Sequence, residues 1–269
     1  MCRPRYSATV SKKIKALELL GNITQNYRSI NFSDITVVNP NLRIDPNLRD
    51  ESGFNADLTL RGYLVPKAFW MDISLFYLGY NNRIGIAETV VNSNGANQLV
   101  AYRTNIGKAY SGGLESYIRL SILDVLQVKN TDWGVDIFMN YSFINGEYTE
   151  GLSSFKGNKL EYVIPHVFKS GVTAEYNHFS VSYQYSYQSE QFTDANNSRQ
   201  VSDATRGVVP EFGLHDLTLS YSKKKLSVKL TVSNLMDSTY FSRRALSYPG
   251  PGIIAGEPRS YYLSLTYKF

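Results

Sequence analysis

The chain has 269 residues, a formal net charge of +5, 43% hydrophobic residues and 13% aromatic residues. No apolar run approaches the roughly 20 residues that a membrane helix needs, which excludes a helical membrane protein. A single cysteine, Cys2, excludes an intrachain disulfide framework. Lysine and arginine are spread along the chain, with Lys223-Lys224-Lys225 as the only run of three, so the sequence predicts no nucleic-acid partner.

The first residues match no expected element. Met1–Lys13 lacks the apolar stretch and the cleavage site of a signal peptide, so an exported chain would be missing its beginning. Residues 1–13 are left unassigned. Residues 14–28 are the first expected strand, because apolar and polar residues alternate from Leu17 to Ile23, although a short helix would suit the same residues equally.

The rest of the chain is dominated by alternation with a period of two residues, which is typical of strands. The clearest case is the segment in which Phe179, Val181 and Tyr183 face away from Ser180 and Ser182. Further strands are expected at residues 55–61, 69–77, 114–122, 133–143, 168–176, 179–187, 217–221, 226–232 and 259–269. The total is about ten strands.

The last of these strands ends on an aromatic residue, Phe269, with no polar tail after it. Its apolar side also carries Tyr261, Leu263, Leu265 and Tyr267. An aromatic residue at the end of an apolar face suits the interfacial belt of an outer-membrane β-barrel better than the fraying end of a soluble sheet.

The connections between the expected strands alternate between short and long. Short connections lie near residues 65, 126, 178 and 224, whereas long polar loops are expected at 29–53, 85–105, 150–166, 193–211 and 236–257. All long loops would then lie at one end of the sheet. Outer-membrane barrels have this arrangement, with short periplasmic turns and longer extracellular loops.

One motif carries a family resemblance. The segment from Val232 to Tyr240, with its Asn-Leu-Met-Asp box, resembles the segment before the last strand of TonB-dependent outer-membrane receptors. The segments Tyr240–Ala245 and Tyr248–Ile254 are similar to the ferric dicitrate receptor branch of that family. The resemblance covers nearly the whole chain from about Ala16.

The resemblance implies an all-β fold in which residues 14–269 are the C-terminal part of a ~22-strand barrel. The N-terminal plug domain and the motif that contacts TonB have no counterpart in the sequence. Many expected inward residues, such as Ser180, Ser182 and Thr231, are small and polar, which suits a wide lumen. We therefore expect an open curved sheet, with the strands at 14–28 and 259–269 unpaired, that neither folds stably nor transports alone.

The resemblance also implies a function. A receptor of this kind takes up an iron chelate such as ferric citrate across the outer membrane of a Gram-negative cell, energised by the TonB complex through the plug region. The expected partners are the chelate, outer-membrane lipid and TonB. The expected ligand-binding residues are Arg243, Arg244, Tyr240 and Tyr248. Guanidinium groups suit a carboxylate-rich anion, but the two arginines would equally serve to fix their own loop.

Two other functions stay open at this point. Outer-membrane barrels of about ten strands include proteases, which need a histidine and an acid together at the mouth, and His166 and His215 are the only candidates. A structural or adhesive barrel is the third class. The three histidines have no cysteine or acidic partner at ligand spacing, so no metal site, cofactor or catalytic residue is expected.

Overall fold

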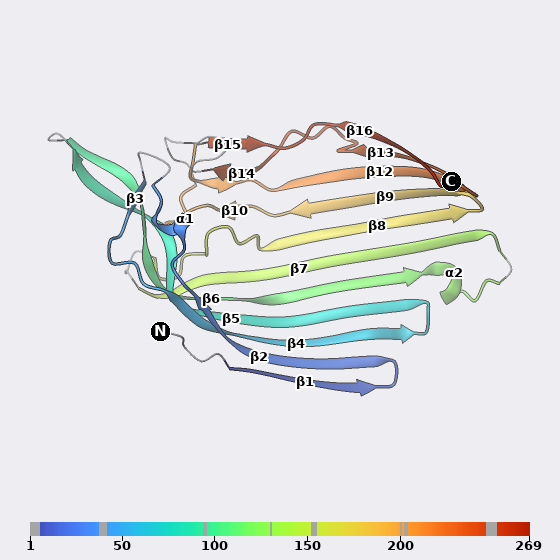
Figure 1. Cartoon of the computed structure of the whole chain (residues 1–269), viewed down its shortest axis with the longest axis horizontal. Helices are drawn as coiled ribbons and strands as arrows, with labels where there is room; N and C mark the ends of the chain where they lie inside the picture. The colour runs from blue at the N-terminus through green and yellow to red at the C-terminus, as the bar shows by residue number, and fades with distance from the viewer. Residues whose placement is uncertain are drawn as a thin grey trace.

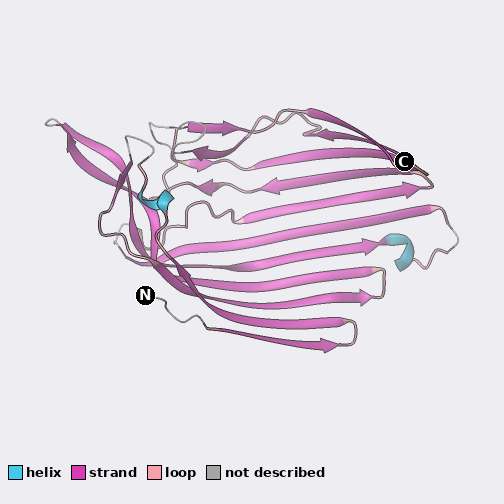
Figure 2. Ribbon diagram, viewed as in Figure 1, coloured by secondary structure: helices cyan, strands magenta, loops and turns pink. Residues whose placement is uncertain are grey.

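Nearly all of the chain forms one curved antiparallel sheet, as the computed structural model shows (Figures 1 and 2). The structure describes residues 6–37, 42–93, 96–129, 131–151, 155–199, 201, 204–245 and 252–269. The turns at one end of the sheet are short. The helix α1 (Phe32–Ile35) and most of the irregular chain gather at the opposite end, which we call the loop end (Figure 1).

The sheet has twelve strands, of which eleven follow one another. In spatial order these are β1 (Ser7–Ile14), β2 (Leu17–Arg28), β4 (Glu51–Val65), β5 (Phe69–Ser93), β6 (Ala96–Ser121), β7 (Trp133–Gly151), β8 (His166–Tyr176), β9 (Phe179–Gln188), β12 (Phe212–Lys223), β13 (Leu226–Ser233) and β16 (Ser260–Tyr267). The short β3 (Leu42–Ile44) pairs in parallel with β6. Within the described residues β1 and β16 do not pair with each other, so the predicted open sheet is confirmed.

The two faces of the sheet differ as the alternation predicts. One face, which we call the apolar face, exposes large side chains: Leu263 is 74% exposed and Val10 is 72% exposed. The other, polar face carries small hydroxyl residues that bond across strands, such as Thr59 to Ser74 at 2.5 Å and Thr173 to Ser182 at 2.9 Å. Such an apolar face is unfavourable in water but suits the hydrocarbon core of a bilayer.

Aromatic rings on the apolar face gather toward both rims. At the short-turn rim, ring centroids of neighbouring strands lie 4.6 Å apart in Trp133–Tyr176 and 4.8 Å apart in Phe179–Tyr221. Toward the loop end, they lie 5.5 Å apart in Phe54–Tyr77 and 5.2 Å apart in Phe143–His166. Along β9, the nine residues from Phe179 to Tyr187 span roughly 27 Å, close to the height of the apolar band of a membrane barrel.

The short turns have a shared backbone feature. Lys15, Lys67, Asn177 and Lys224 have φ of 57°, 64°, 52° and 55°, the left-handed conformation that tight hairpin turns need. The remaining connection at that end contains the helix α2 (Ile122–Val125). The predicted short connections near residues 65, 178 and 224 are confirmed, whereas the one near residue 126 spans residues 122–132 and the predicted loop at 85–105 differs.

The expectation of a long polar loop at 85–105 is wrong. Strands β5 and β6 continue as a paired ladder to Ser93 and Ala96. The register shifts between Tyr80 and Ile84, where Asn82 has φ of 54°, and beyond this bulge the hairpin turns away from the sheet (Figure 1). Past the apolar band, neither face has to be lipid-soluble, so the ladder persists although the alternation fades.

The start of the sheet also differs from the expectation. The first strand is β1, which lies within the unassigned residues 1–13 apart from Ile14 and pairs along its whole length with β2. Its apolar alternation is short and is interrupted by Lys12, which hides the strand signal. The long loops contain further short strands: β10 (Gln191–Phe192) pairs with β11 (Val208–Val209), and β14 (Phe241–Ala245) pairs with β15 (Gly252–Ala255).

The Asn-Leu-Met-Asp box forms a turn that ties the last two long strands together. Asn234 is 3% exposed and has φ of 50°. Its Nδ2 donates to the carbonyl oxygens of Ser238 at 2.9 Å and Glu257 at 3.2 Å, and its Oδ1 accepts from the Ser238 amide at 2.8 Å. Asp237 Oδ1 accepts from the Arg259 amide at 3.0 Å. Asparagine suits this position because it tolerates left-handed φ and both donates and accepts.

Candidate functional site

A network of charged side chains lies at the loop end of the sheet, beyond the apolar band. At its centre is Glu51 of β4, which is 4% exposed. Its carboxylate lies 3.3 Å from the Arg28 guanidinium and 3.7 Å from that of Arg83, and it accepts from the Ile84 amide at 2.7 Å. Arg28 also forms two hydrogen bonds to Asp34, at 2.7 Å and 2.8 Å. The buried Glu51 carboxylate thus joins strand β2 to the bulge of β5. Arg28 in turn joins helix α1 to this network through Asp34.

The loop after β7 packs onto this network. Tyr148 is fully buried, Glu161 is 6% exposed, and the Tyr148 hydroxyl donates to Glu161 Oε2 at 2.7 Å. Around them is a small apolar core that joins β5, β6 and β7 to the loop: Ala87, Ile106, Ala109, Phe155, Leu160 and Ala195. The loop is therefore docked by burial and by a buried hydrogen bond.

Burial changes the protonation of these groups. It raises the pKa of Glu161, against the lowering effects of Arg83 and of the Tyr148 hydrogen bond. Burial, followed by the nearby Glu161 carboxylate, raises the pKa of Tyr148. For Arg83, burial acts to lower the pKa, but Glu161 and Glu51 outweigh it and raise the pKa. Arg83 therefore stays charged, while Glu161 is more readily neutral than an ordinary glutamate.

A cavity of about 370 Å³ opens beside the network. Its lining includes Arg28, Arg83, Arg103, Glu161 and Tyr162. The Arg103 guanidinium donates to the carbonyl oxygen of Ser33. Within the described residues, the buried Nε of Arg83 has no hydrogen-bond partner. The guanidinium groups of the lining could pair with an anionic ligand, although Asp34, Glu51 and Glu161 line the same cavity.

The predicted ligand residues lie on another hairpin of the loop end. Arg243 and Arg244 are in β14. The side chain of Arg243 is exposed. Burial, followed by the Glu161 carboxylate, raises the pKa of the Tyr162 hydroxyl, and the charges of Arg103 and Arg243 act in the opposite direction. Arg243 therefore acts electrostatically on Tyr162, a residue of the cavity lining, but is not itself among the described residues that line the cavity.

Arg244 contacts its own surroundings instead. Its Nε donates to the Val208 carbonyl oxygen at 3.0 Å and its Nη1 to the Ala204 carbonyl oxygen at 3.0 Å. Its guanidinium also lies over the Phe241 ring, 5.3 Å from the centroid. These contacts fix the loop before β12, which is the second of the two roles that the sequence leaves open.

Of the two tyrosines of the predicted site, Tyr240 is not among the residues that line the cavity. Tyr240 stacks on Phe212 with ring centroids 4.5 Å apart and packs against Gly256. Tyr248 lies outside the described residues. Sequence reasoning missed Arg28, Glu51 and Glu161. No spacing along the sequence could have found them, because they lie on separate segments of the chain.

The histidines do not form a catalytic pair with an acid. His166 Nδ1 is hydrogen-bonded to the Tyr141 hydroxyl at 2.9 Å, and His215 Nδ1 to the Tyr183 hydroxyl at 2.6 Å. Both tyrosines belong to the apolar face, whereas Asp216, next to His215, points to the polar face because neighbours alternate. In the described part of the chain, no three His, Cys, Asp or Glu side chains gather as a possible metal site. None of the described helices could cross a membrane.

An antiparallel sheet with an exposed apolar face, aromatic rims and long loops at one end is the wall of a membrane β-barrel. The sequence profile of the family "TonB dependent receptor-like, beta-barrel" matches residues 6–235. The chain therefore belongs to the TonB-dependent receptor β-barrel family, whose members are outer-membrane receptors and not enzymes.

Among solved structures, the chain is similar to the ferric citrate transporter FecA in the unliganded form, with a TM-score of 0.76 and 24% identity over 99% of this chain and 38% of that one. For the siderophore receptor PiuA from Acinetobacter baumannii, the TM-score is 0.69 and the identity 15%, over 98% of this chain and 36% of that one. For the copper transporter OprC, the TM-score is 0.70 and the identity is 14%, over 98% of this chain and 39% of that one. The chain thus spans less than two fifths of these proteins. No curated protein matches the sequence.

Proposed function

We propose that the chain is the C-terminal part of the barrel of a TonB-dependent receptor that takes up an iron chelate, such as ferric citrate, in the outer membrane of a Gram-negative cell. The two unpaired edges, β1 and β16, support the larger barrel, because exposed backbone groups in a bilayer need strand partners. Energy would come from the TonB complex through the plug region of the whole receptor.

The observation that carries the choice of ligand is the arginine-lined cavity at the loop end. Arg28, Arg83 and Arg103 line it, and the exposed Arg243 acts electrostatically on Tyr162 of the same lining. Asp34, Glu51 and Glu161 also line the cavity, but the raised pKa of Glu161 lessens its negative charge. A carboxylate-rich chelate would pair with the guanidinium groups in the bidentate geometry that arginine favours.

Similar structures include transporters named for ferric citrate and for copper, and a siderophore receptor. The fold therefore does not determine the ligand, and the side chains of the loop end must do so. Arg243 and Arg103 are the residues we assign to ligand contact. Arg244 acts by holding the neighbouring loop, and Tyr240 by packing beside it.

The test is equilibrium binding of ferric citrate, in detergent micelles, to the whole receptor that contains this chain. Arg103→Ala and Arg243→Ala should each weaken binding about tenfold, since each removes one charge-assisted hydrogen bond. Arg119→Ala is the matched control, because Arg119 lies on the polar face near the short-turn rim. Unchanged binding in both loop-end variants, or equal losses in the control, would refute the proposed ligand site and leave the family assignment intact.

A further inference from the structure

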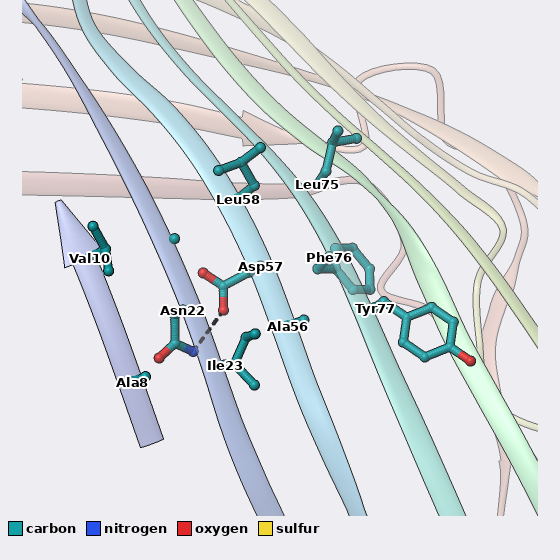
Figure 3. Close-up of a pocket in the computed structure, with 11 residues that line it drawn as sticks. Ala8, Val10, Asn22, Ile23, Ala56, Asp57, Leu58, Leu75, Phe76 and Tyr77 are labelled. Carbon is teal, nitrogen blue, oxygen red and sulfur yellow. Dashed lines mark hydrogen bonds between the residues drawn. The ribbon is translucent and has the colours of Figure 1, made fainter. Parts of the chain in front are cut away.

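The apolar face contains a hollow that the uptake function does not use. It spans β1, β2, β4 and β5 and has a volume of about 520 Å³ (Figure 3). Small residues, Ala8, Gly21 and Ala56, occupy three successive strands within it. In the register of the sheet, Ala8 is opposite Ile23 and Gly21 is opposite Val10 and Leu58. Small and large side chains therefore alternate across the strands and leave a depression between them.

The side chains around the hollow are apolar and exposed. Ile23 is 61%, Leu58 50%, Leu75 53% and Tyr77 43% exposed. Asn22 and Asp57 also border it, but Asn22 Nδ2 donates to Asp57 Oδ1 at 2.9 Å, so these two groups satisfy each other (Figure 3). Being next to Ile23 and Leu58 in sequence, they belong to the polar face. The hollow therefore suits an occupant without polar groups.

A cation marks one end of the hollow. Lys12 follows Val10 on the apolar face, about 7 Å further along β1 toward the short-turn rim. Its neighbour across the ladder is Leu19, and Leu60 comes next. Lys15 lies in the adjoining turn with φ of 57°. A lysine on a lipid-facing surface extends its ammonium group toward the headgroups at the nearest interface. The basic end of the hollow thus lies at the periplasmic rim of the barrel.

We propose that this hollow binds one acyl chain of an anionic glycerophospholipid from the periplasmic leaflet, whose phosphate contacts Lys12. The acyl chain lies over Ala8, Gly21 and Ala56, where the missing side-chain volume gives it contacts that a flat surface would not. The position of Lys12 indicates which leaflet of the membrane supplies the lipid. Because Lys12 is at the short-turn rim, the headgroup belongs to the periplasmic leaflet and not to the leaflet at the loop end. The site is independent of the ligand that the receptor carries.

The test is lipid binding in detergent by the whole receptor that contains this chain, measured by native mass spectrometry with dioleoyl phosphatidylglycerol, dioleoyl phosphatidylcholine and lipid A as probes. We expect phosphatidylglycerol to bind more tightly, and Lys12→Met to reduce its affinity about fivefold, the effect of one lysine near a charged membrane surface. Ala56→Leu fills the hollow and should weaken binding of both glycerophospholipids.

Lys13→Met is the matched control, because Lys13 is the next residue along β1 but faces the polar side, opposite Glu18. It should leave the affinity unchanged, and circular dichroism confirms that each variant keeps its sheet. Lys12→Met alone is sufficient for the test if Ala56→Leu does not fold. Equal binding of the two glycerophospholipids by the unmodified receptor, equal effects of the two lysine variants, or stronger binding of lipid A than of phosphatidylglycerol would overturn the proposal.

Discussion

Tyr148 donates a 2.7 Å hydrogen bond to Glu161, and both side chains are buried where the loop after β7 packs on the sheet. This bond joins a residue of the barrel wall to the loop that borders the arginine-lined cavity. Since Glu161 is also held close to Arg83, the docking of the loop and the charge of the cavity depend on the same carboxyl group.

Removing this hydrogen bond should loosen the loop. Tyr148→Phe leaves the buried Glu161 without its partner, which costs about 1–3 kcal/mol. Hydrogen exchange of the amides of residues 155–162 should become faster by the factor to which this loss of free energy corresponds. Tyr187→Phe is the control, because the Tyr187 hydroxyl bonds to Glu211 at an exposed position, at 2.5 Å. Equal protection of the loop in Tyr148→Phe and in the unmodified chain would contradict the assigned role.

Docking of the same loop should depend on pH. The pKa of Glu161 in the folded state lies above its ordinary value of 4.5, so the folded state binds its proton more tightly than the unfolded state does. The contribution of Glu161 to stability is therefore complete below about pH 4.5 and is lost as the pH rises through the raised pKa. Hydrogen exchange of the loop measured against pH should show this loss, and Glu161→Gln should remove it. A loop that becomes better protected with rising pH would show that Arg83 dominates instead.

The register of the sheet predicts opposite effects for neighbouring positions of β9. Val181 is 44% exposed on the apolar face, so Val181→Arg should destabilise the sheet in a bilayer by about 2–4 kcal/mol. Arginine at Tyr183, on the same face, should have a similar effect and also break the bond to His215. Ser182→Arg should change stability much less, because Ser182 faces the polar side. Urea titration of the whole receptor that contains this chain, in lipid vesicles, measures all three, and equal effects would refute the register.

Arg243 and Arg244 should separate into two roles. Arg244→Ala removes the donors to Ala204 and Val208, so amides of residues 204–209 should exchange several times faster, corresponding to about 1 kcal/mol or more. Arg243→Ala should leave this exchange unchanged, because its side chain is exposed. The opposite result, with loop exchange altered by Arg243→Ala only, would remove the structural role assigned to Arg244.

The Asn-Leu-Met-Asp turn should tolerate few changes at Asn234. Asn234→Ala removes three hydrogen bonds and places an alanine at φ of 50°, so we expect a loss of at least 2 kcal/mol in the free energy of unfolding. Asn234→Gly keeps the backbone conformation and isolates the hydrogen-bond contribution. Urea titration of the whole receptor in lipid vesicles compares the two variants, and equal stability of Asn234→Ala and the unmodified receptor would show that the turn is held by other contacts.

The sequence determined the parts of this protein that local physics controls. Within a bilayer, every strand must turn apolar residues to lipid, so alternation such as that from Phe179 to Tyr187 identifies the strand and its face without any knowledge of the fold. Short connections are equally local, because a tight turn needs left-handed φ at one or two residues such as Asn177 and Lys224. The open antiparallel sheet follows from these two signals and the family motif.

Only the tertiary structure decided what happens beyond the apolar band. There the lipid no longer constrains the strands, so the extended hairpin of β5 and β6 is indistinguishable from a polar loop in the sequence. Arg28, Glu51, Arg83 and Glu161 come from four separate segments, and no spacing along the chain brings them together. The roles of Arg243 and Arg244 also separate only in the fold, because alternation within β14 points one side chain outward and the other onto the carbonyl groups of a loop about 40 residues away.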